Sequence, residues 1–277
     1  MNYIVAVSGG VDSVVLLHKL IQIGTHTLTV AHFDHGIRPA SDADARFVKA
    51  LTKLYDLPYE SRREELGPKA SEATARERRY LYLRHMANKH QATIATAHHA
   101  DDLIETIAIN LIRGTGWRGL AVFDSPTIER PLLPLTKRDI YDYALAHQLE
   151  WVEDETNATD VYLRNRVRSR IHQSVSLETR NRLMELWQAQ RQLKHEIMDE
   201  EKSIIETDKP YSRYVFTHID PVVASELLRF ITKQGITRPQ AERALHTIKT
   251  ARSGTVSQIG AGLQLTFTAG NFTVQTP

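Results

Sequence analysis

Six consecutive residues near the start of the chain have the types and order of a phosphate-binding loop. They are Ser8, Gly9, Gly10, Val11, Asp12 and Ser13. The loop follows the apolar run Tyr3–Val7 and precedes a helical stretch expected to begin near Val14. Glycines let the backbone turn with its amides facing a ligand, and the serine hydroxyls and the helix N-terminus favour an anion. We therefore predict a nucleotide phosphate site, with a plain strand-to-helix turn as the alternative.

Asp12 is the unexpected member of this loop, because a carboxylate next to phosphates repels them unless a cation lies between. A magnesium ion that bridges one or two carboxylates to a polyphosphate meets that condition. We predict that Asp12 helps to hold Mg²⁺ on the nucleotide phosphates. The loop lacks the Gly-Lys-Ser/Thr of a Walker motif, so the chain is not a P-loop NTPase.

Two histidines stand at the end of the second strand expected, Leu28–Phe33. His32 and His35 flank Asp34, with Arg38 just beyond. Histidines three residues apart can ligate zinc, but no third soft ligand lies near them in the sequence. A role facing the nucleotide is favoured for both.

A second polar group follows the strand expected over Ala92–Ala97. His98, Asp102 and Glu105 lie where that strand ends and the helix Asp101–Ile112 begins. Asp102 and Glu105 are three residues apart, and we expect them to share the helix face opposite the apolar stripe. Capping of the helix N-terminus explains one acidic residue, but not the whole group. An active-site role is therefore favoured.

Arginines and a tryptophan complete the candidate residues of the first half. Arg76 shares the apolar seam of the helix Ser71–His90, so we expect it to meet a phosphate or, alternatively, a structural carboxylate. Arg113 and Trp117 begin a long Gly- and Pro-rich loop over 114–134, which suits a substrate cover or a surface on which a base stacks. A helix end at Gly114 with Trp117 in the core is the alternative, and both can hold.

A basic stretch lies further along the chain. Residues 161–182 contain six arginines and one acidic residue, Glu178, although the net charge of the whole chain is only +2. Such a stripe attracts a phosphate backbone, and we expect Arg164 and Arg168 to contact RNA. A solvated helix without a ligand is the alternative.

The elements that must position these groups alternate between strand and helix in the first half of the chain. This alternation predicts an α/β fold with a doubly wound parallel sheet, whose ligands bind beyond the carboxyl ends of the strands. We predict a catalytic domain over residues 1–175, a helical linker over 176–208 and a small α+β C-terminal domain over 209–277.

Composition excludes several classes of protein. The 277 residues include no cysteine, which rules out thiolate nucleophiles, persulfide carriers and cysteine-ligated clusters within this chain. No run of apolar residues is long enough to cross a bilayer, and the N-terminus lacks the pattern of a secretory leader. We expect a cytoplasmic protein without a membrane or DNA partner.

Four further stretches, together with the loop SGGVDS, carry a resemblance to a known family. They are AHFDHGIRP (31–39), SEATARERRYLYL (71–83), TAHHADDLIETIAINLIRGTGWRGL (96–120) and DETNATDVYLRNRVR (154–168). In this order and spacing they resemble the tRNA(Ile)-lysidine synthetases, which belong to the PP-loop superfamily of ATP pyrophosphatases. The resemblance covers roughly residues 1–170 and implies the adenine nucleotide alpha hydrolase-like fold.

The resemblance implies a ligase that forms a carbon–nitrogen bond with ATP and Mg²⁺ as cofactors. ATP adenylates the carbonyl oxygen at carbon 2 of the wobble cytidine in the CAU anticodon of tRNA(Ile), and free L-lysine then displaces AMP from that carbon. In this reaction Arg76 or Arg113 offsets phosphate charge, Asp102 and Glu105 bind the lysine ammonium, and His98 or a carboxylate accepts its proton. The segment that contains His32 and His35 borders the ATP site, and Trp117, Arg164 and Arg168 contact the tRNA.

Two alternatives remain at this stage. A tRNA thiolase of the same superfamily shares the loop but needs cysteines, which this chain lacks. A nucleotide-binding module without catalysis needs neither a lysine site nor a basic stripe.

Overall fold

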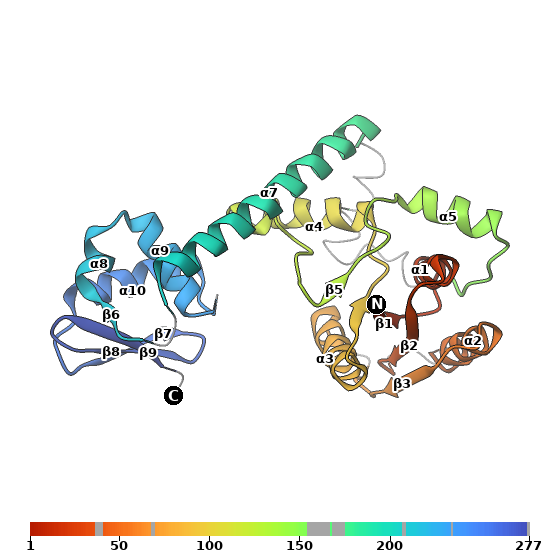
Figure 1. Ribbon diagram of the computed structural model, residues 1–277, viewed down its shortest axis with the longest axis horizontal. Helices are drawn as coiled ribbons and strands as arrows, with labels where there is room; N and C mark the ends of the chain where they lie inside the picture. The colour runs from red at the N-terminus through yellow and green to blue at the C-terminus, as the bar shows by residue number, and fades with distance from the viewer. Residues whose placement is uncertain are drawn as a thin grey trace. The chain divides into compact units, whose positions relative to one another are not determined.

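The chain forms two compact units, Met1–Arg191 and Gln192–Pro277. The computed structural model describes residues 1–36, 41–67, 70–153, 167, 175–206, 209–233 and 235–275. The boundary between the units falls inside a single long helix, α7 (Leu177–Ile204), which occupies most of the linker expected over 176–208 (Figure 1).

A five-stranded parallel sheet is the centre of the first unit. Its strands are β1 (Asn2–Ala6), β2 (Thr27–Asp34), β3 (Tyr59–Arg63), β4 (Thr93–Ala95) and β5 (Ile128–Glu129). They are ordered β3-β2-β1-β4-β5, so the direction of winding reverses between β1 and β4. The predicted doubly wound parallel sheet is confirmed, and the reversal is where such folds bind ligands.

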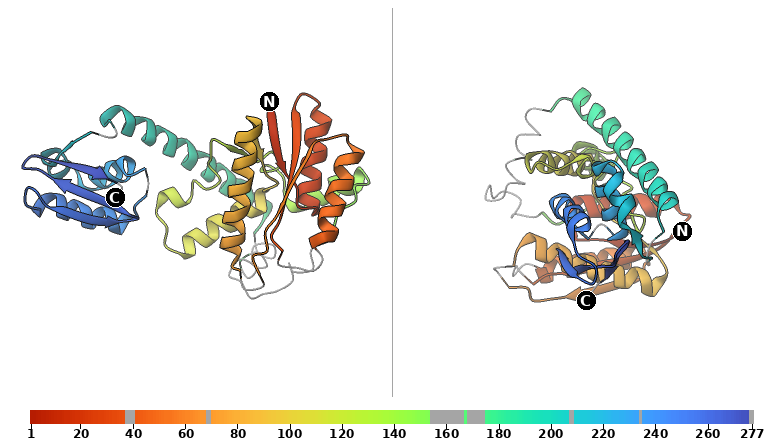
Figure 2. Two further views of the ribbon diagram at one scale, coloured as in Figure 1. Left: turned by 90° about the horizontal axis from the view of Figure 1, so that it is seen from below. Right: turned by 90° about the vertical axis from the view of Figure 1, so that its left-hand side faces the viewer.

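Helices cover both faces of this sheet because neighbouring residues of β1 point to opposite sides (Figure 2). Tyr3 and Val5 pack in a core built with helices on one face, whereas Ile4 belongs to the core beneath a helix on the other. The first face carries α1 (Val11–Ile23), α2 (Ser41–Leu54) and α5 (Lys137–Ala146), and the second carries α3 (Glu72–His90).

Helix α4 (Ala100–Ile112) follows β4 and packs against α7. Leu103 and Ile107 form a buried cluster with Trp187, whose indole Nε1 donates a 2.8 Å hydrogen bond to the Val122 carbonyl. The N-terminal half of α7 is thereby packed against the helix that carries Asp102.

Local sequence signals explain most helix starts. Ser71, the first residue of the helix expected over Ser71–His90, is the N-cap of α3 and accepts a hydrogen bond from the Thr74 amide. Thr136 caps α5 in the same way, because its hydroxyl accepts from the Asp139 amide. Helix α1 begins at Val11, three residues before the start expected near Val14, so Asp12 and Ser13 lie in its first turn.

The segment over 114–134, expected to be one long loop, is more structured than that. It contains a 3₁₀ turn, η1 (Trp117–Gly119), and the edge strand β5. A strand of two residues is too short to show an alternating pattern, which is why the sequence did not reveal it.

The described residues of the second unit combine a four-stranded antiparallel sheet with short helices, as the α+β expectation described. Its strands are ordered β6-β9-β8-β7, and Phe267 and Phe272 are at the centre of its core. The elements are β6 (Tyr211–Ser212), α8 (Arg213–His218), α9 (Pro221–Ile231), α10 (Arg238–Thr250), β7 (Val256–Gly260), β8 (Leu263–Phe267) and β9 (Asn271–Gln275).

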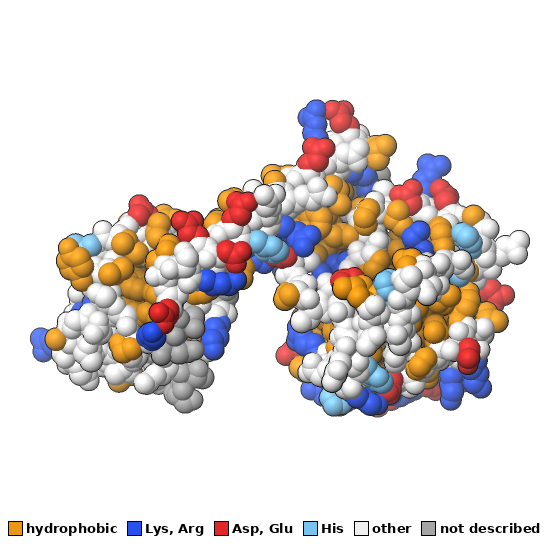
Figure 3. All heavy atoms as spheres, in the orientation of Figure 1, with side chains coloured by type: hydrophobic (Ala, Val, Ile, Leu, Met, Phe, Trp, Pro, Cys, Tyr) orange, Lys and Arg blue, Asp and Glu red, His pale blue; other side chains and the backbone are white. Residues whose placement is uncertain are grey.

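Charged side chains of both signs are interspersed on the face shown in Figure 3, in accord with the small net charge of +2. Among the described residues, no helix has both the length and the apolar composition that crossing a membrane requires.

Candidate active site

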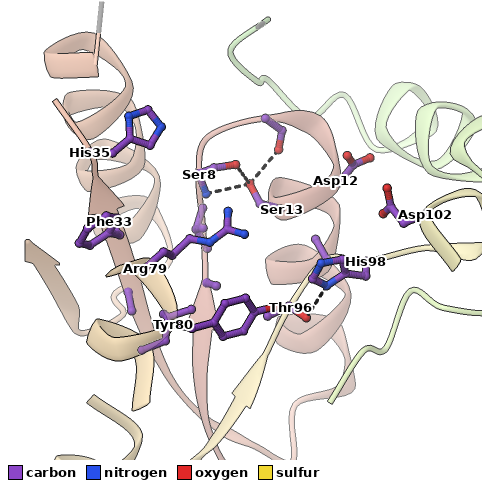
Figure 4. Close-up of a pocket in the computed structure, with 16 residues that line it drawn as sticks. Ser8, Asp12, Ser13, Phe33, His35, Arg79, Tyr80, Thr96, His98 and Asp102 are labelled. Atoms are coloured by element: carbon purple, nitrogen blue, oxygen red, sulfur yellow. Dashed lines mark hydrogen bonds between the residues drawn. The ribbon is translucent and has the colours of Figure 1, made fainter. Parts of the chain in front are cut away.

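A cavity of about 310 Å³ opens at the carboxyl edge of the parallel sheet, where the strand order reverses (Figure 4). Its walls come from the loop after β1, the ends of β2 and β4, and the first turns of α1 and α4. Helix α3 contributes Arg79 and Tyr80. Residues distant in sequence therefore meet at one place, as the fold requires of its ligand site.

The loop over Ser8–Ser13 is held in shape by its own hydrogen bonds. The Ser13 hydroxyl accepts from the amides of Ser8 and Gly9, both at 3.2 Å, and donates to the Gly10 carbonyl at 2.8 Å. Gly9 has a φ of +98°, a conformation that favours glycine. Gly10 is the N-cap of α1 and has no side chain to cap the helix, so the N-terminus of α1 can bind an anion.

Not every residue of the loop lines the cavity. Ser8, Gly10, Asp12 and Ser13 do. Gly9 supports the turn, and Val11 is buried in the core beneath α1. The loop is thus a rigid cradle in which four residues face the cavity.

The carboxylate of Asp12 has the chemistry and the position to take part in holding Mg²⁺. A cation already lies against it, because the Lys137 ammonium is 2.5 Å from its Oδ1. The Asp102 carboxylate lines the same cavity. Among the described residues no cluster of three or more His, Asp or Glu side chains forms a metal cage. This donor set fits Mg²⁺, which typically uses one or two carboxylates together with substrate phosphates.

The imidazole of His98 is fixed in the cavity wall as a neutral group. Its Nδ1 lies 2.9 Å from the Thr96 hydroxyl, and its ring centroid lies 4.8 Å from that of Phe123. Burial, and then the charges of Arg76, Arg130 and Arg79, lower the pKa of His98 to about 2. The neutral imidazole can donate or accept a hydrogen bond with a substrate, but near neutral pH it does not keep a second proton and become an imidazolium.

The first turn of α4 brings Asp102 to the cavity beside Asp12 of the phosphate loop (Figure 4). Its Oδ2 accepts a 3.1 Å hydrogen bond from the His99 amide and lies 3.4 Å from His99 Nε2. His99 is buried and also lies 3.9 Å from Asp12 Oδ1. One imidazole therefore lies between the two carboxylates.

Guanidinium groups gather around the ring of Tyr80. The Cζ atoms of Arg76 and Arg79 lie 5.0 and 5.6 Å from its centroid. Of these two, Arg79 lines the cavity and Arg76 does not, although Arg76 was the arginine expected to meet a phosphate. Positive charge at this wall suits an anionic ligand.

Comparison with known proteins agrees with this geometry. A family model described as the PP-loop domain, of ATP-binding type, matches residues 1–175. The chain belongs to the PP-loop family. The matched range includes every residue that lines the cavity, together with the loop Ser8–Ser13.

Several relatives of the chain are named tRNA(Ile)-lysidine synthases. The chain is 42% identical to a tRNA(Ile)-lysidine synthase of Exiguobacterium sibiricum over 174 residues, covering 61% of this chain and 42% of the relative. It is 33% identical to a tRNA(Ile)-lysidine synthase of Haemophilus ducreyi over 250 residues, covering 82% of this chain and 56% of the relative. The chain therefore spans about half the length of these relatives.

A solved structure supports the fold alone. The U34-tRNA thiolase NcsA of Methanococcus maripaludis, determined with its [4Fe-4S] cluster, matches with a TM-score of 0.59 at 15% identity. The match covers 70% of this chain and 72% of the thiolase.

Two predicted residues of this PP-loop site lie outside the cavity wall. His32 is 4% exposed, and its Nδ1 lies 2.9 Å from the Val7 carbonyl, so it joins β2 to the end of β1. His35 does line the cavity.

Glu105 is 2% exposed and lies among buried residues of α4, whereas Leu111 and Ile112, which were expected to be on the apolar side of this helix, are exposed. The expected polar face of α4 is therefore wrong beyond Asp102.

Helix α4 separates another pair of predicted residues from the cavity. Arg113 is exposed at its C-terminal end, about 16 Å from Asp102 by the rise of a helix. Trp117 is partly exposed in η1, where the Arg118 Cζ lies 4.6 Å from its ring centroid. The structure does not bring either side chain to the phosphate loop. Arg164 and Arg168 lie outside the described residues.

Sequence reasoning missed a set of ionic contacts beneath the PP-loop. Lys137 pairs with Asp12, and its amide donates a 2.7 Å hydrogen bond to Asp101 Oδ2. Arg180, counted in the basic stripe, instead forms an ion pair with the buried Asp101. The lysine at the positive end of α5 was the available signal, because a cation there is locally unfavourable.

Proposed function

We propose that this PP-loop protein is a tRNA(Ile)-lysidine synthetase. It would use ATP and Mg²⁺ to join free L-lysine to carbon 2 of the wobble cytidine in the CAU anticodon of tRNA(Ile). The similarity to lysidine synthases at 33–42% identity supports this, although the chain spans about half of their length. We also propose that the protein is located in the cytoplasm, where its proposed substrates are found.

One observation carries the proposal. A single cavity has the phosphate loop on one wall and Asp102 with the neutral His98 on another. A nucleotide-binding module without catalysis needs only the first wall. A carboxylate facing the phosphate loop suits a second, cationic substrate such as the ammonium of lysine.

In the first proposed step, the carbonyl oxygen at carbon 2 of the cytidine attacks the α-phosphorus of ATP, and pyrophosphate leaves. Ser8, Gly10 and Ser13 would hold the departing phosphates, and Asp12 would help to hold Mg²⁺, which supplies charge neutralisation when bound. Arg79, which lines the cavity, would offset charge at the reacting phosphate. Arg76 would support it from beside Tyr80.

In the second proposed step, the lysine side-chain amine attacks carbon 2, the carbon–oxygen bond breaks, and AMP leaves with the oxygen. Asp102 is the carboxylate best situated to bind the lysine ammonium, because it lines the cavity. Glu105 would add negative charge to the lysine site from its buried position on α4. His98, with its pKa lowered to about 2, would serve as a neutral hydrogen-bonding group. A carboxylate or the leaving phosphate would then take the lysine proton.

We propose that tRNA is held outside the cavity. Arg113 is exposed where α4 ends, Trp117 is partly exposed in η1, and Arg164 and Arg168 belong to the basic stretch over 161–182. Arginines bind the backbone of a single-stranded loop, and an aromatic ring stacks on its bases. We assign residues 1–175 to catalysis, 176–208 to the linker and 209–277 to further tRNA contact.

The test measures incorporation of radiolabelled lysine into a tRNA(Ile) transcript with a CAU anticodon, with and without ATP. A transcript whose wobble cytidine is changed to uridine is the control. We expect ATP-dependent incorporation that the control transcript abolishes. Pyrophosphate release without incorporation would make lysine the wrong nucleophile. No turnover of ATP under any condition would favour the nucleotide-binding module.

A further inference from the structure

Lys137 is held against the phosphate loop from a different element of the fold. It is the first residue of α5, and its ammonium lies 2.5 Å from Asp12 Oδ1. Its amide donates to Asp101 Oδ2 at 2.7 Å, and Asp101 in turn pairs with Arg180. The backbone of Lys137 is therefore fixed, while its side chain extends to a carboxylate that lines the cavity.

The position of this lysine is costly in terms of local structure. The N-terminal end of a helix carries partial positive charge, so an ammonium in the first turn of α5 is disfavoured. The acidic residue of that turn, Asp139, accepts hydrogen bonds from the amide and hydroxyl of Thr136. Lys137 instead reaches across to α1. Its ammonium also lies 5.0 Å from the centroid of the Tyr141 ring.

The next residue provides a contrast. Arg138 carries the same charge in the same turn, but its side chain is 89% exposed and lies 3.7 Å from Asp142. The side chain of Lys137 is 27% exposed. Of these two adjacent cations, only Lys137 is directed to the cavity wall.

We propose that Lys137 is a phosphate-contacting residue of the reaction, which Asp12 holds in place in the free protein and which binds the pyrophosphate that leaves ATP. The inference rests on the proposed function, because it assumes that phosphates occupy the loop. Lys137 has three N–H donors and no acceptor, so one contact with Asp12 leaves donors for phosphate oxygens. A cation at this point stabilises the negative charge that develops on the leaving group.

Because Asp12 is shared by Lys137 and the metal, loss of the Lys137 ammonium should change metal binding and phosphate binding in opposite directions. A purely structural role of Lys137 would not produce such opposite changes. Without phosphate, Lys137 and a divalent cation compete for Asp12, so removal of the ammonium strengthens metal binding to the free protein. With phosphate present, Lys137 contributes to binding, so the same substitution weakens it. A substitution that merely loosened α5 would weaken both.

The experiment compares Lys137→Gln with Arg138→Gln, which removes the same charge one residue away. Binding of inorganic pyrophosphate in excess Mg²⁺ is measured by calorimetry, and binding of Mn²⁺ alone by electron paramagnetic resonance. We expect Lys137→Gln to weaken pyrophosphate binding about tenfold or more, as loss of a charged hydrogen bond does, and to tighten Mn²⁺ binding. Arg138→Gln should change neither.

Lys137→Arg keeps the charge and should retain most pyrophosphate binding, and thermal unfolding checks that each variant is folded. Equal pyrophosphate binding by Lys137→Gln and the unchanged protein would overturn the inference. So would a parallel loss of Mn²⁺ and pyrophosphate binding. Neither titration contains lysine or tRNA, so failure of lysine incorporation would reject the proposed function without deciding this result.

Discussion

The amide of Val152 donates a 3.0 Å hydrogen bond to the carbonyl of Gly9, which ties the phosphate loop to the segment that follows α5. A Cβ added at Gly9 would lie 3.7 Å from Val152 Cγ2 and 3.5 Å from Phe47 Cδ1, both ordinary contacts. Space therefore does not explain the glycine. Its φ of +98° does, because other residues rarely adopt that angle.

We expect Gly9→Ala to lower the free energy of unfolding by about 1–3 kcal/mol and to weaken ATP binding, because the strained loop loses its shape. Chemical denaturation and calorimetric titration with ATP measure the two effects. Gly254→Ala is the matched control. It has a φ of +80° with no atom within 4 Å of the added Cβ, and it lies in the second unit. It should reduce stability without changing ATP affinity.

His98 should remain neutral at physiological pH. Its folded-state pKa is lowered to about 2, below the ordinary 6.5, so the unfolded chain binds the proton first as the pH falls. The contribution of neutral His98 to the free energy of unfolding is therefore fully present above pH 6.5 and is lost as the pH falls below 6.5. The loss is roughly 2 kcal/mol at pH 5. His98→Asn should show a smaller loss of stability between pH 7 and 5. An imidazole NMR signal of His98 that titrates near pH 6.5 would contradict this.

The pair of Asp101 and Arg180 should contribute strongly to stability. Their side chains are 8% and 14% exposed. Burial opposes ionisation of Asp101, but hydrogen bonds from the Lys137 amide and Arg180 hold its pKa below the usual value. Arg180→Met leaves that carboxylate buried without its partner, and we expect a loss of about 3–5 kcal/mol in urea unfolding.

Arg182→Met is the control for that substitution. Arg182 pairs with Glu178 on the surface, and both side chains are about three-quarters exposed. Such pairs contribute roughly 0–1 kcal/mol. Similar losses for Arg180→Met and Arg182→Met would show that the ion pair with Asp101 is not special.

Asp102 should determine the affinity for lysine. We expect Asp102→Asn to raise the KM for lysine and to lower kcat, each about tenfold or more, because the ammonium loses its charged partner. Steady-state lysine incorporation measures both constants. Asp142→Asn removes an exposed carboxylate on α5 and should leave them unchanged. Unaltered constants in Asp102→Asn and Glu105→Gln would remove both residues from the lysine site.

Local pattern was enough to predict much of this fold. Alternating apolar strands and amphipathic helices indicated the parallel sheet, and Ser71 marked the start of α3 through capping, a contact between near neighbours. The order of Ser8–Ser13 indicated a phosphate loop before any contact was known. These inferences depend on interactions within a few residues, which a sequence records directly.

Contacts between residues that are distant in the sequence could not be predicted from local pattern. The sequence could not say that Lys137 meets Asp12 across 125 positions, or that Arg180 belongs to Asp101 rather than to an exposed basic stripe. Nor could it separate Arg79 in the cavity from Arg76 beside it, because one helical turn decides which guanidinium faces the ligand. The sequence by itself determined the kinds of elements and the phosphate loop, which follow from local sterics and periodicity. Only the packing of α1, α4, α5 and α7 decided which charges meet, because distant side chains become partners through tertiary contact alone.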